Sequence, residues 1–181
     1  MLEAVLKNQE KDNKNVKATY EFYTDGSLKD RGSLKSVMGS SWIQTLGPNP
    51  NTIFKMGSLS WPSSSKAKAL AIFTVLLTVP EKRKVKIVTD SQTCIDIFRK
   101  LSLPHPKFTK KKLFKVNNWS IWTKIIETVQ SKVLTIDLVK IKAHSGNLSN
   151  EYADQLAKKA LDLLSVKIDY QETGPILSPP S

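Results

Sequence analysis

The sequence predicts an α/β domain in which a mixed β-sheet, opening with three antiparallel strands, is covered by helices. Three observations support this fold class. Strand-like and helix-like segments follow one another along most of the chain, and the second and third strand-like segments are separated by a Gly-Pro-Asn-Pro turn at 47–50. Hydrophobic residues make up 40% of the 181 residues, which is enough to fill one core.

The first three elements are predicted to be strands. Residues Ala18–Thr24 alternate and are rich in Tyr, Phe and Thr, which favour strands. The segments Val37–Leu46 and Thr52–Ser60 are the next two candidates. Trp61 is expected to follow the third strand and, like Trp42, to lie in the core or cover the sheet.

The remaining elements alternate between helix and strand. Ser63–Ser65 offer N-caps for an apolar helix that reaches Leu77. The later elements are expected in this order: a strand at Val85–Thr89, a helix at about 91–101, a helix opening at Asn117 or Asn118, a strand at Val133–Ile141, and a helix from about Ser149.

These elements predict one folded domain with two tails. Residues 1–16 are expected to be a flexible charged N-terminal segment, because Lys, Asn, Asp and Glu dominate residues 7–17. Residues 17–166 form the predicted domain. Residues 167–181 are expected to be a C-terminal tail, whose prolines argue against regular structure.

The charge of the chain favours a polyanionic partner. Lys and Arg number 28 against 16 Asp and Glu, a formal net charge of +12. Nucleic acid is the simplest such partner, although an anionic membrane surface would also attract this charge. The most apolar run, Ala69–Val79, is much shorter than the roughly 20 residues of a membrane span. The single cysteine, Cys94, is consistent with an intracellular setting, nucleus and cytoplasm not being distinguished.

Three aspartates draw attention as a candidate site. Each has an ordinary structural explanation: Asp25 in an Asp-Gly turn, Asp90 where a strand passes into a helix capped by Asp90 or Ser91, and Asp154 in an ion pair with Lys158 four residues on. Together they suggest more, because carboxylates at two strand ends and one helix start can converge. Such a cluster is typical of Mg²⁺ sites, and two such ions can promote phosphodiester cleavage.

The motifs around these aspartates resemble the type 1 ribonuclease H family, in particular the ribonuclease H domains of retroelement (non-LTR) reverse transcriptases. The resemblance is carried by Tyr23–Ser27, by Thr89–Gln92, and by the run from Ala143 through Asp154. It implies a five-stranded mixed sheet, dependence on Mg²⁺ or alternatively Mn²⁺, and endonucleolytic cleavage of the RNA strand of RNA–DNA hybrids.

The resemblance also implies roles for individual residues. Asp25 would bridge both metal ions, Asp90 would hold the nucleophile-side ion, and Asp154 would hold the leaving-group-side ion. His144 matches the family's mobile histidine near the scissile phosphate. Its alternative is an ordinary surface histidine in a loop.

Lys68 departs from this family pattern, because it stands where the family has its fourth metal-binding carboxylate, a glutamate. No other acidic residue lies between Asp30 and Glu81 to replace it. Two unit charges about 5 Å apart at an effective dielectric of about 20 interact by roughly 3 kcal/mol, so Lys68 should repel a divalent ion about twice as strongly. We expect metal binding to be weakened, with one site more plausible than two, and the ammonium to pair with Asp25 or Asp154.

A second group of residues is predicted to contact nucleic acid. Lysines interleaved with phenylalanine between the second and third helices suit phosphate contacts, although a solvated linker is the alternative. Hydroxyl and amide groups near the aspartates suit the 2′-hydroxyl of RNA. The candidates are Gly26, Ser27, Ser64, Lys107, Lys110, Lys111, Lys112, Lys115 and Asn117.

Several functions remain open from the sequence. The leading one is a ribonuclease H-type domain whose catalysis is impaired by Lys68. One alternative is a catalytically inactive pseudoenzyme that binds hybrid or duplex nucleic acid, and another is a protein-interaction scaffold. A fourth is a slow one-metal nuclease in which the Lys68 ammonium replaces the second metal. The chain is expected to be a monomer or part of a larger retroelement polyprotein.

Overall fold

The computed structural model describes residues 19–59, 61–103, 116–143 and 145–164, which form a five-stranded mixed sheet flanked by helices. The strand order is β3-β2-β1-β4-β5. The β1–β2 and β2–β3 pairs are antiparallel, and the β1–β4 and β4–β5 pairs are parallel. The predicted fold class is confirmed. The strands are β1 (Thr19–Lys29), β2 (Val37–Leu46), β3 (Ile53–Ser58), β4 (Lys84–Thr89) and β5 (Thr135–Lys140).

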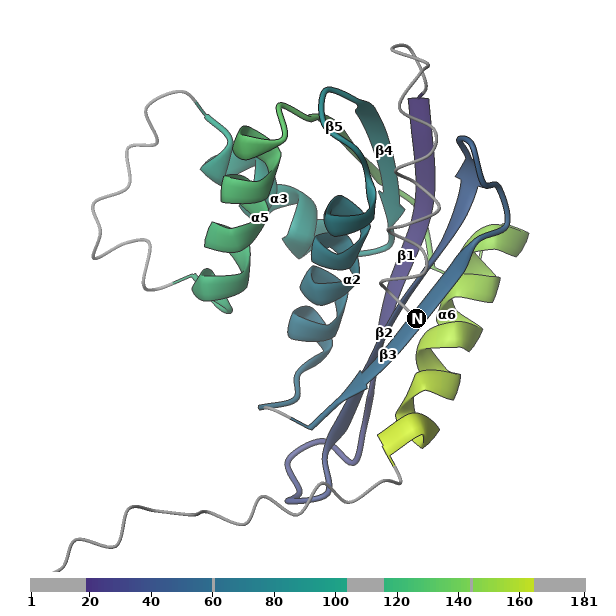
Figure 1. Ribbon diagram of the computed structural model, residues 1–181. Coiled ribbons are helices and arrows are strands. Elements are labelled where there is room, and N and C mark those ends of the chain that lie inside the picture. Colours follow the sequence, from purple (N-terminus) through teal and green to yellow (C-terminus); the bar gives the residue numbers. More distant parts are fainter. Residues whose placement is uncertain (1–18, 60, 104–115, 144, 165–181) are drawn as a thin grey trace, which may run out of the picture.

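The helices lie on both faces of the sheet. Figure 1 shows α2, α3 and α5 on one face and α6 on the other. Among the described residues, none of these helices is long and apolar enough to span a membrane. The helices are α2 (Ser64–Thr78), α3 (Gln92–Leu101), α5 (Trp119–Ser131) and α6 (Leu148–Ala160), and a short 3₁₀ turn, η1 (Leu161–Leu164), follows α6.

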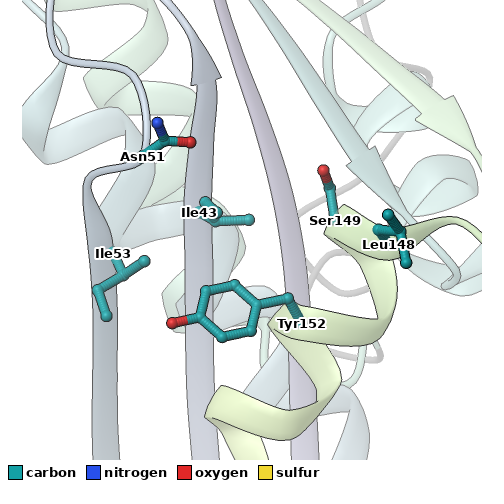
Figure 2. Close-up of a pocket in the computed structure, with 6 residues that line it drawn as sticks. All are labelled: Ile43, Asn51, Ile53, Leu148, Ser149 and Tyr152. Carbon is teal, nitrogen blue, oxygen red and sulfur yellow. The ribbon is translucent and has the colours of Figure 1, made fainter.

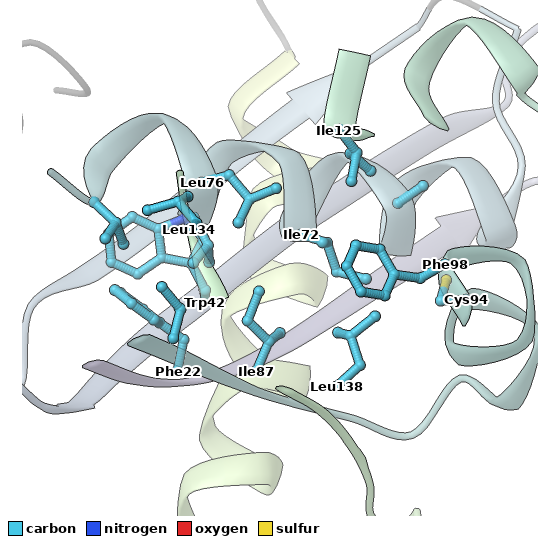
Figure 3. Close-up of a cluster of buried hydrophobic side chains, with 14 of the residues drawn as sticks. Phe22, Trp42, Ile72, Leu76, Ile87, Cys94, Phe98, Ile125, Leu134 and Leu138 are labelled. Atoms are coloured by element: carbon cyan, nitrogen blue, oxygen red, sulfur yellow. The ribbon is translucent and has the colours of Figure 1, made fainter. Parts of the chain in front are cut away.

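The main hydrophobic core fills the space between the sheet and the helices α2, α3 and α5. Phe22, Trp42 and Ile87 extend from three neighbouring strands and meet Ile72 and Ile125 from the helices (Figure 3). The rings of Phe22 and Trp42 pack edge to face, with their centroids 5.3 Å apart. Burying such large side chains is the main source of stability in a domain of this size.

The structure corrects two predictions, one about the end of the first strand and one about Trp61. The first strand was expected to stop at Thr24, with Asp25 in a turn as one alternative, but β1 continues through Asp25 to Lys29 because β2 pairs with it over this whole stretch. Trp42 is buried as predicted, whereas Trp61 is 88% exposed and lies outside the core. The predicted tails, 1–16 and 167–181, lie outside the described residues.

The far end of α2 is fixed by Lys132. Its ammonium donates hydrogen bonds to the carbonyl oxygens of Leu76, Leu77 and Val79, at 2.9–3.0 Å. These carbonyls have no partner within the helix, so a cation there satisfies them and complements the helix dipole. Burial lowers the pKa of Lys132. The anchor holds α2 against the sheet, and the first turn of α2 supplies part of the candidate site.

Candidate active site

Asp25 and Asp90 lie side by side where the parallel pairing of β1 with β4 ends. The last pair in this register is Thr24 with Thr89, so each aspartate is the next residue along its chain segment, Asp25 within β1 and Asp90 directly after β4. Beyond this level β4 has ended, and β1 pairs only with β2 among the described strands. Carboxyl groups on neighbouring parallel strands are therefore brought together by the sheet itself. The sequence-based expectation that Asp25 and Asp90 converge agrees with this geometry.

The first turn of α2 is held close to β1 beside these aspartates. Ser63 caps the helix by accepting a hydrogen bond from the backbone N–H of Lys66. Ser40 of β2 donates a hydrogen bond to the carbonyl oxygen of Ala67 at 2.7 Å. A Cβ atom at Gly26 would lie 2.5 Å from the backbone nitrogen of Lys68, so glycine is required for this approach. The helix thereby brings Lys68 to Asp25 and Asp90.

The helix α6 approaches from the other face of the sheet. Ser41 of β2 donates a hydrogen bond to the carbonyl oxygen of Ala153 at 2.6 Å, and Gly39 leaves room for the backbone of Ala157. Asn147 caps the helix by accepting from the N–H of Asn150 at 3.0 Å. These contacts place Asp154, one residue after Ala153, next to the aspartates of the strands.

Strand β1, the helices α2 and α6, and the segments that follow β4 and β5 enclose a small polar pocket of about 130 Å³. It contains all three predicted aspartates together with Lys68, so the expected convergence of residues far apart in the sequence is present. The side chains of Asp25, Lys68 and Asp90 are largely removed from solvent, with exposures of 9%, 15% and 17%. The lining residues are Asp25, Gly26, Ser64, Lys68, Asp90, Ala143, Asn150, Glu151 and Asp154.

Lys68 forms ion pairs with both aspartates of the strands. Its Nζ lies 3.0 Å from Asp25 Oδ1 and donates a hydrogen bond to Asp90 Oδ1. Burial acts to lower the pKa of Lys68, but the charges and hydrogen bonds of Asp25 and Asp90 together outweigh it, and the pKa is raised. Burial raises the pKa of Asp25, although Lys68 opposes this shift. Lys68 therefore remains an ammonium ion at neutral pH.

Asp154 has a different partner. Its Oδ2 accepts from the ammonium of Lys158 at 2.6 Å, one turn along the same helix, as the ordinary structural explanation of Asp154 predicted. The alternative that Lys68 pairs with Asp154 is not what the structure has. Lys140, at the end of β5, donates a hydrogen bond to the backbone carbonyl oxygen of Asp90. Two further cations thus flank the pocket.

The residues present do not fit the pair of divalent ions that the family resemblance implies. The ammonium of Lys68 lies within ion-pair distance of both Asp25 and Asp90 and neutralises much of their charge. Within the described part of the chain there is no group of three or more His, Cys, Asp or Glu side chains arranged to hold a metal ion. A cation must displace this ammonium before it can share the two carboxylates.

The other predicted contact residues divide into three groups. Gly26 and Ser64 line the pocket. Ser27 is half-buried on β1 and Asn117 is exposed ahead of α5, and neither lines it. The predictions for His144, Lys107, Lys110, Lys111, Lys112 and Lys115 lie outside the described residues.

Sequence reasoning did not single out Asn150, Glu151 or Lys140. Asn150 and Glu151 precede Asp154 by four and three residues, which places them on the same face of a helix. That spacing was the available signal. For Lys140 there was none, because its contact with Asp90 depends on the pairing of β5 with β4.

A second hollow lies on the α6 face of the sheet. Figure 2 shows Ile43 and Ile53 on β2 and β3 opposite Leu148 and Tyr152 of α6. Asn51 and Ser149 complete the lining, and none of the described residues that line this hollow carries a charge. It offers no acid, base or nucleophile of the kind found in the first pocket, and we assign it no role.

Comparison with known proteins agrees with this geometry. The sequence model of the RNase H family, described as RNase H, matches residues 17–162. The ribonuclease H of Clostridium botulinum (strain Hall) is 23% identical over 147 residues, covering 80% of this chain and 96% of that protein. The ribonuclease H of Rippkaea orientalis is 25% identical over 131 residues, covering 65% of this chain and 74% of that protein.

The fold also matches a solved structure. The crystal structure of LC9-RNase H1, described as a type 1 RNase H with the type 2 active-site motif, aligns with a TM-score of 0.60 at 15% identity. The alignment covers 81% of this chain and 73% of that one. At this identity the match concerns the fold alone. Because the family model spans most of the sequence, the chain belongs to the RNase H family.

Proposed function

We propose that this domain binds RNA–DNA hybrids and that its cleavage of the RNA strand is severely weakened by Lys68. The RNase H family acts on such hybrids, and the net charge of +12 suits a polyanionic ligand. The observation that carries the second half of the proposal is the contact of the Lys68 ammonium with both Asp25 and Asp90.

The chemistry follows from charge. Four carboxylates would give the site a formal charge of −4, whereas Asp25, Asp90, Asp154 and Lys68 give −2. In the family, Mg²⁺ or Mn²⁺ needs the oxygen atoms that here already accept from an ammonium. Binding of the phosphate backbone does not need the divalent metal ion. The exposed lysines Lys140 and Lys142 lie at the end of the sheet that carries the pocket and can contact phosphates directly. We therefore expect the domain to bind hybrid although its cleavage of the RNA strand is weakened.

We further propose an origin in a retroelement reverse transcriptase. The motif from Ala143 to Asp154 supports it, because its residue types and spacing resemble those domains. In that setting the domain would form part of a larger polyprotein and would hold hybrid that another domain makes. His144 and the lysines of 107–115 are proposed to add contacts to the hybrid.

Binding without cleavage is the direct test of this proposal. We expect the chain to bind a labelled RNA–DNA hybrid in EDTA, with an affinity that falls by orders of magnitude between low and physiological salt, since each phosphate contact contributes about 0.9 to the logarithmic salt slope. Fluorescence anisotropy over a salt series measures this. Duplex DNA and duplex RNA serve as competitors.

Two results would contradict the proposal. One is an affinity for hybrid that is undetectable at low salt, which would favour a protein-interaction scaffold. The other is vigorous Mg²⁺-dependent production of RNA fragments by the unmodified chain, which would show that Lys68 does not block the site.

A further inference from the structure

Trp61 is the most exposed of the four tryptophans. Trp42 and Trp122 are buried and Trp119 is 37% exposed, whereas Trp61 is 88% exposed. Its backbone has a φ of +48°, a left-handed conformation that is strained for a bulky residue. Such strain persists where the surrounding structure imposes it and is found preferentially at functional sites. The exposure of the ring and the strain of its backbone together indicate that Trp61 has a function.

The position of Trp61 in the chain, close to the polar pocket, indicates what this function is. Trp61 precedes the α2 cap, Ser63, by two residues and Ser64, which lines the polar pocket, by three. Three residues of chain span at most about 10 Å, so the backbone of Trp61 lies within that distance of the backbone of Ser64 at the pocket. Figure 1 shows the connection from β3 to α2 leaving the sheet at the end where the β1–β2 turn also lies. A strand of nucleic acid that crosses the pocket passes this connection.

Among the described residues, Trp61 has no hydrogen bond, no ion pair and no aromatic ring stacked on it. An indole face in water can stack on any nucleobase, and such stacking tolerates different base sequences. The strongly positive chain favours nucleic acid over a neutral protein partner.

We propose that Trp61 is a stacking platform for an unpaired nucleotide next to the bound hybrid. The bases inside a duplex already stack on both faces, so along the bound hybrid the ring face is met by a base that has left the helix. The preferred ligand is then a hybrid that carries a single-stranded extension, rather than a blunt one. This inference rests on the proposed binding of hybrid and adds the class of substrate that the site selects.

The experiment compares a short blunt hybrid with the same hybrid extended by single-stranded RNA or DNA, both bound in EDTA. For the unmodified chain we expect at least one extension to tighten binding about tenfold. Trp61→Leu keeps an apolar side chain without an aromatic face, and Trp61→Asn suits the left-handed backbone. Both should bind the extended hybrid no better than the blunt one, whereas Trp61→Phe should keep most of the gain.

Two controls separate stacking from a structural role. Leu59→Ala removes a neighbouring exposed side chain and should leave the gain unchanged. The extended hybrid should quench tryptophan emission of the unmodified chain, and Trp61→Phe should remove most of that quenching. Melting temperatures of all variants should stay within a few degrees, with Trp61→Asn equal to or above the unmodified chain because it relieves strain.

The outcomes distinguish this inference from the proposed function. If blunt hybrid binds but neither extension tightens binding, or if Trp61→Leu retains the gain, Trp61 is not a stacking platform and the proposed function stands. If Trp61→Leu instead abolishes self-association and leaves nucleic-acid affinity unchanged, the ring serves a protein contact and the inference is overturned. If no hybrid binds at all, both proposals fail.

Discussion

Replacing Lys68 by glutamate is expected to produce Mg²⁺-dependent cleavage of the RNA strand of a hybrid, at least about 100-fold above the unmodified chain. The change removes an ammonium from between Asp25 and Asp90 and adds the fourth carboxylate of the family pattern. Release of labelled RNA fragments, with and without EDTA, measures it. Because the new carboxylate would repel Asp25 and Asp90 without a cation, the variant should also melt at a higher temperature with Mg²⁺ than with EDTA.

The matched control is Lys68→Gln, which removes the positive charge without supplying a carboxylate. We expect little or no cleavage from it, because neutralising the ammonium alone leaves the metal one ligand short. The opposite pattern would contradict this account. If the unmodified chain cleaves hybrid and Lys68→Ala does not, the ammonium takes part in catalysis and the site is a one-metal nuclease.

Replacing Lys68 by methionine is expected to lower the free energy of unfolding by about 2 to 3 kcal/mol. Methionine keeps the length of the side chain but leaves Asp25 and Asp90 facing each other without a counter-ion. The expected loss lies below that of a fully buried pair, because these side chains keep some contact with water. Urea unfolding in EDTA measures it.

This stability difference should depend on pH in a defined direction. The pKa of Lys68 is raised above its ordinary value of 10.5 by its two aspartates, so its contribution is fully present below that value and is lost as the pH rises through the folded-state pKa. On the alkaline side, the difference in stability between the unmodified chain and Lys68→Met should therefore persist until strong alkali. It should also shrink in acid, as Asp25, whose pKa is raised by burial, takes up a proton.

Lys158→Met provides the comparison for this measurement. It breaks the ion pair with Asp154, but that pair is more exposed, with 58% of the Lys158 side chain accessible. We expect a loss below about 1 kcal/mol, as for other surface pairs. Equal losses for the two variants would mean that Lys68 is an ordinary surface lysine.

Much of the fold was predictable because local patterns and tertiary packing agree. The alternation and turn residues around β2 gave its bounds, Val37–Leu46, without error. In β1 the local pattern disagrees with the tertiary packing, because Asp-Gly at 25–26 is a strong turn signal. Strand pairing with β2 overrides that signal, and the strand continues to Lys29. Trp61 was misplaced for a related reason, since large aromatics are usually buried and its exposure depends on the strained connection before α2.

The candidate site was predictable in its members and in part of its pairings. The pairs Lys68–Asp25 and Lys158–Asp154 were among the predicted alternatives, whereas the pair Lys68–Asp90 was not. Asp25, Asp90, Lys68 and Asp154 do meet in one pocket. Which carboxylate pairs with Lys68 depends on positions that no local pattern encodes. Asp90 joins Asp25 in contact with Lys68 because β4 runs parallel to β1 in register, whereas Asp154 pairs with Lys158 on its own helix. Lys140 enters the site only because β5 lies next to β4.

A crystal structure grown with millimolar Mn²⁺ tests the central claim most directly, because anomalous scattering locates that ion without reference to the protein. We expect no anomalous peak between Asp25 and Asp90 in the unmodified chain, with the Lys68 ammonium in that place, and a clear peak there in Lys68→Glu. A peak at that position in the unmodified chain, with Lys68 turned away from both aspartates, would contradict the account.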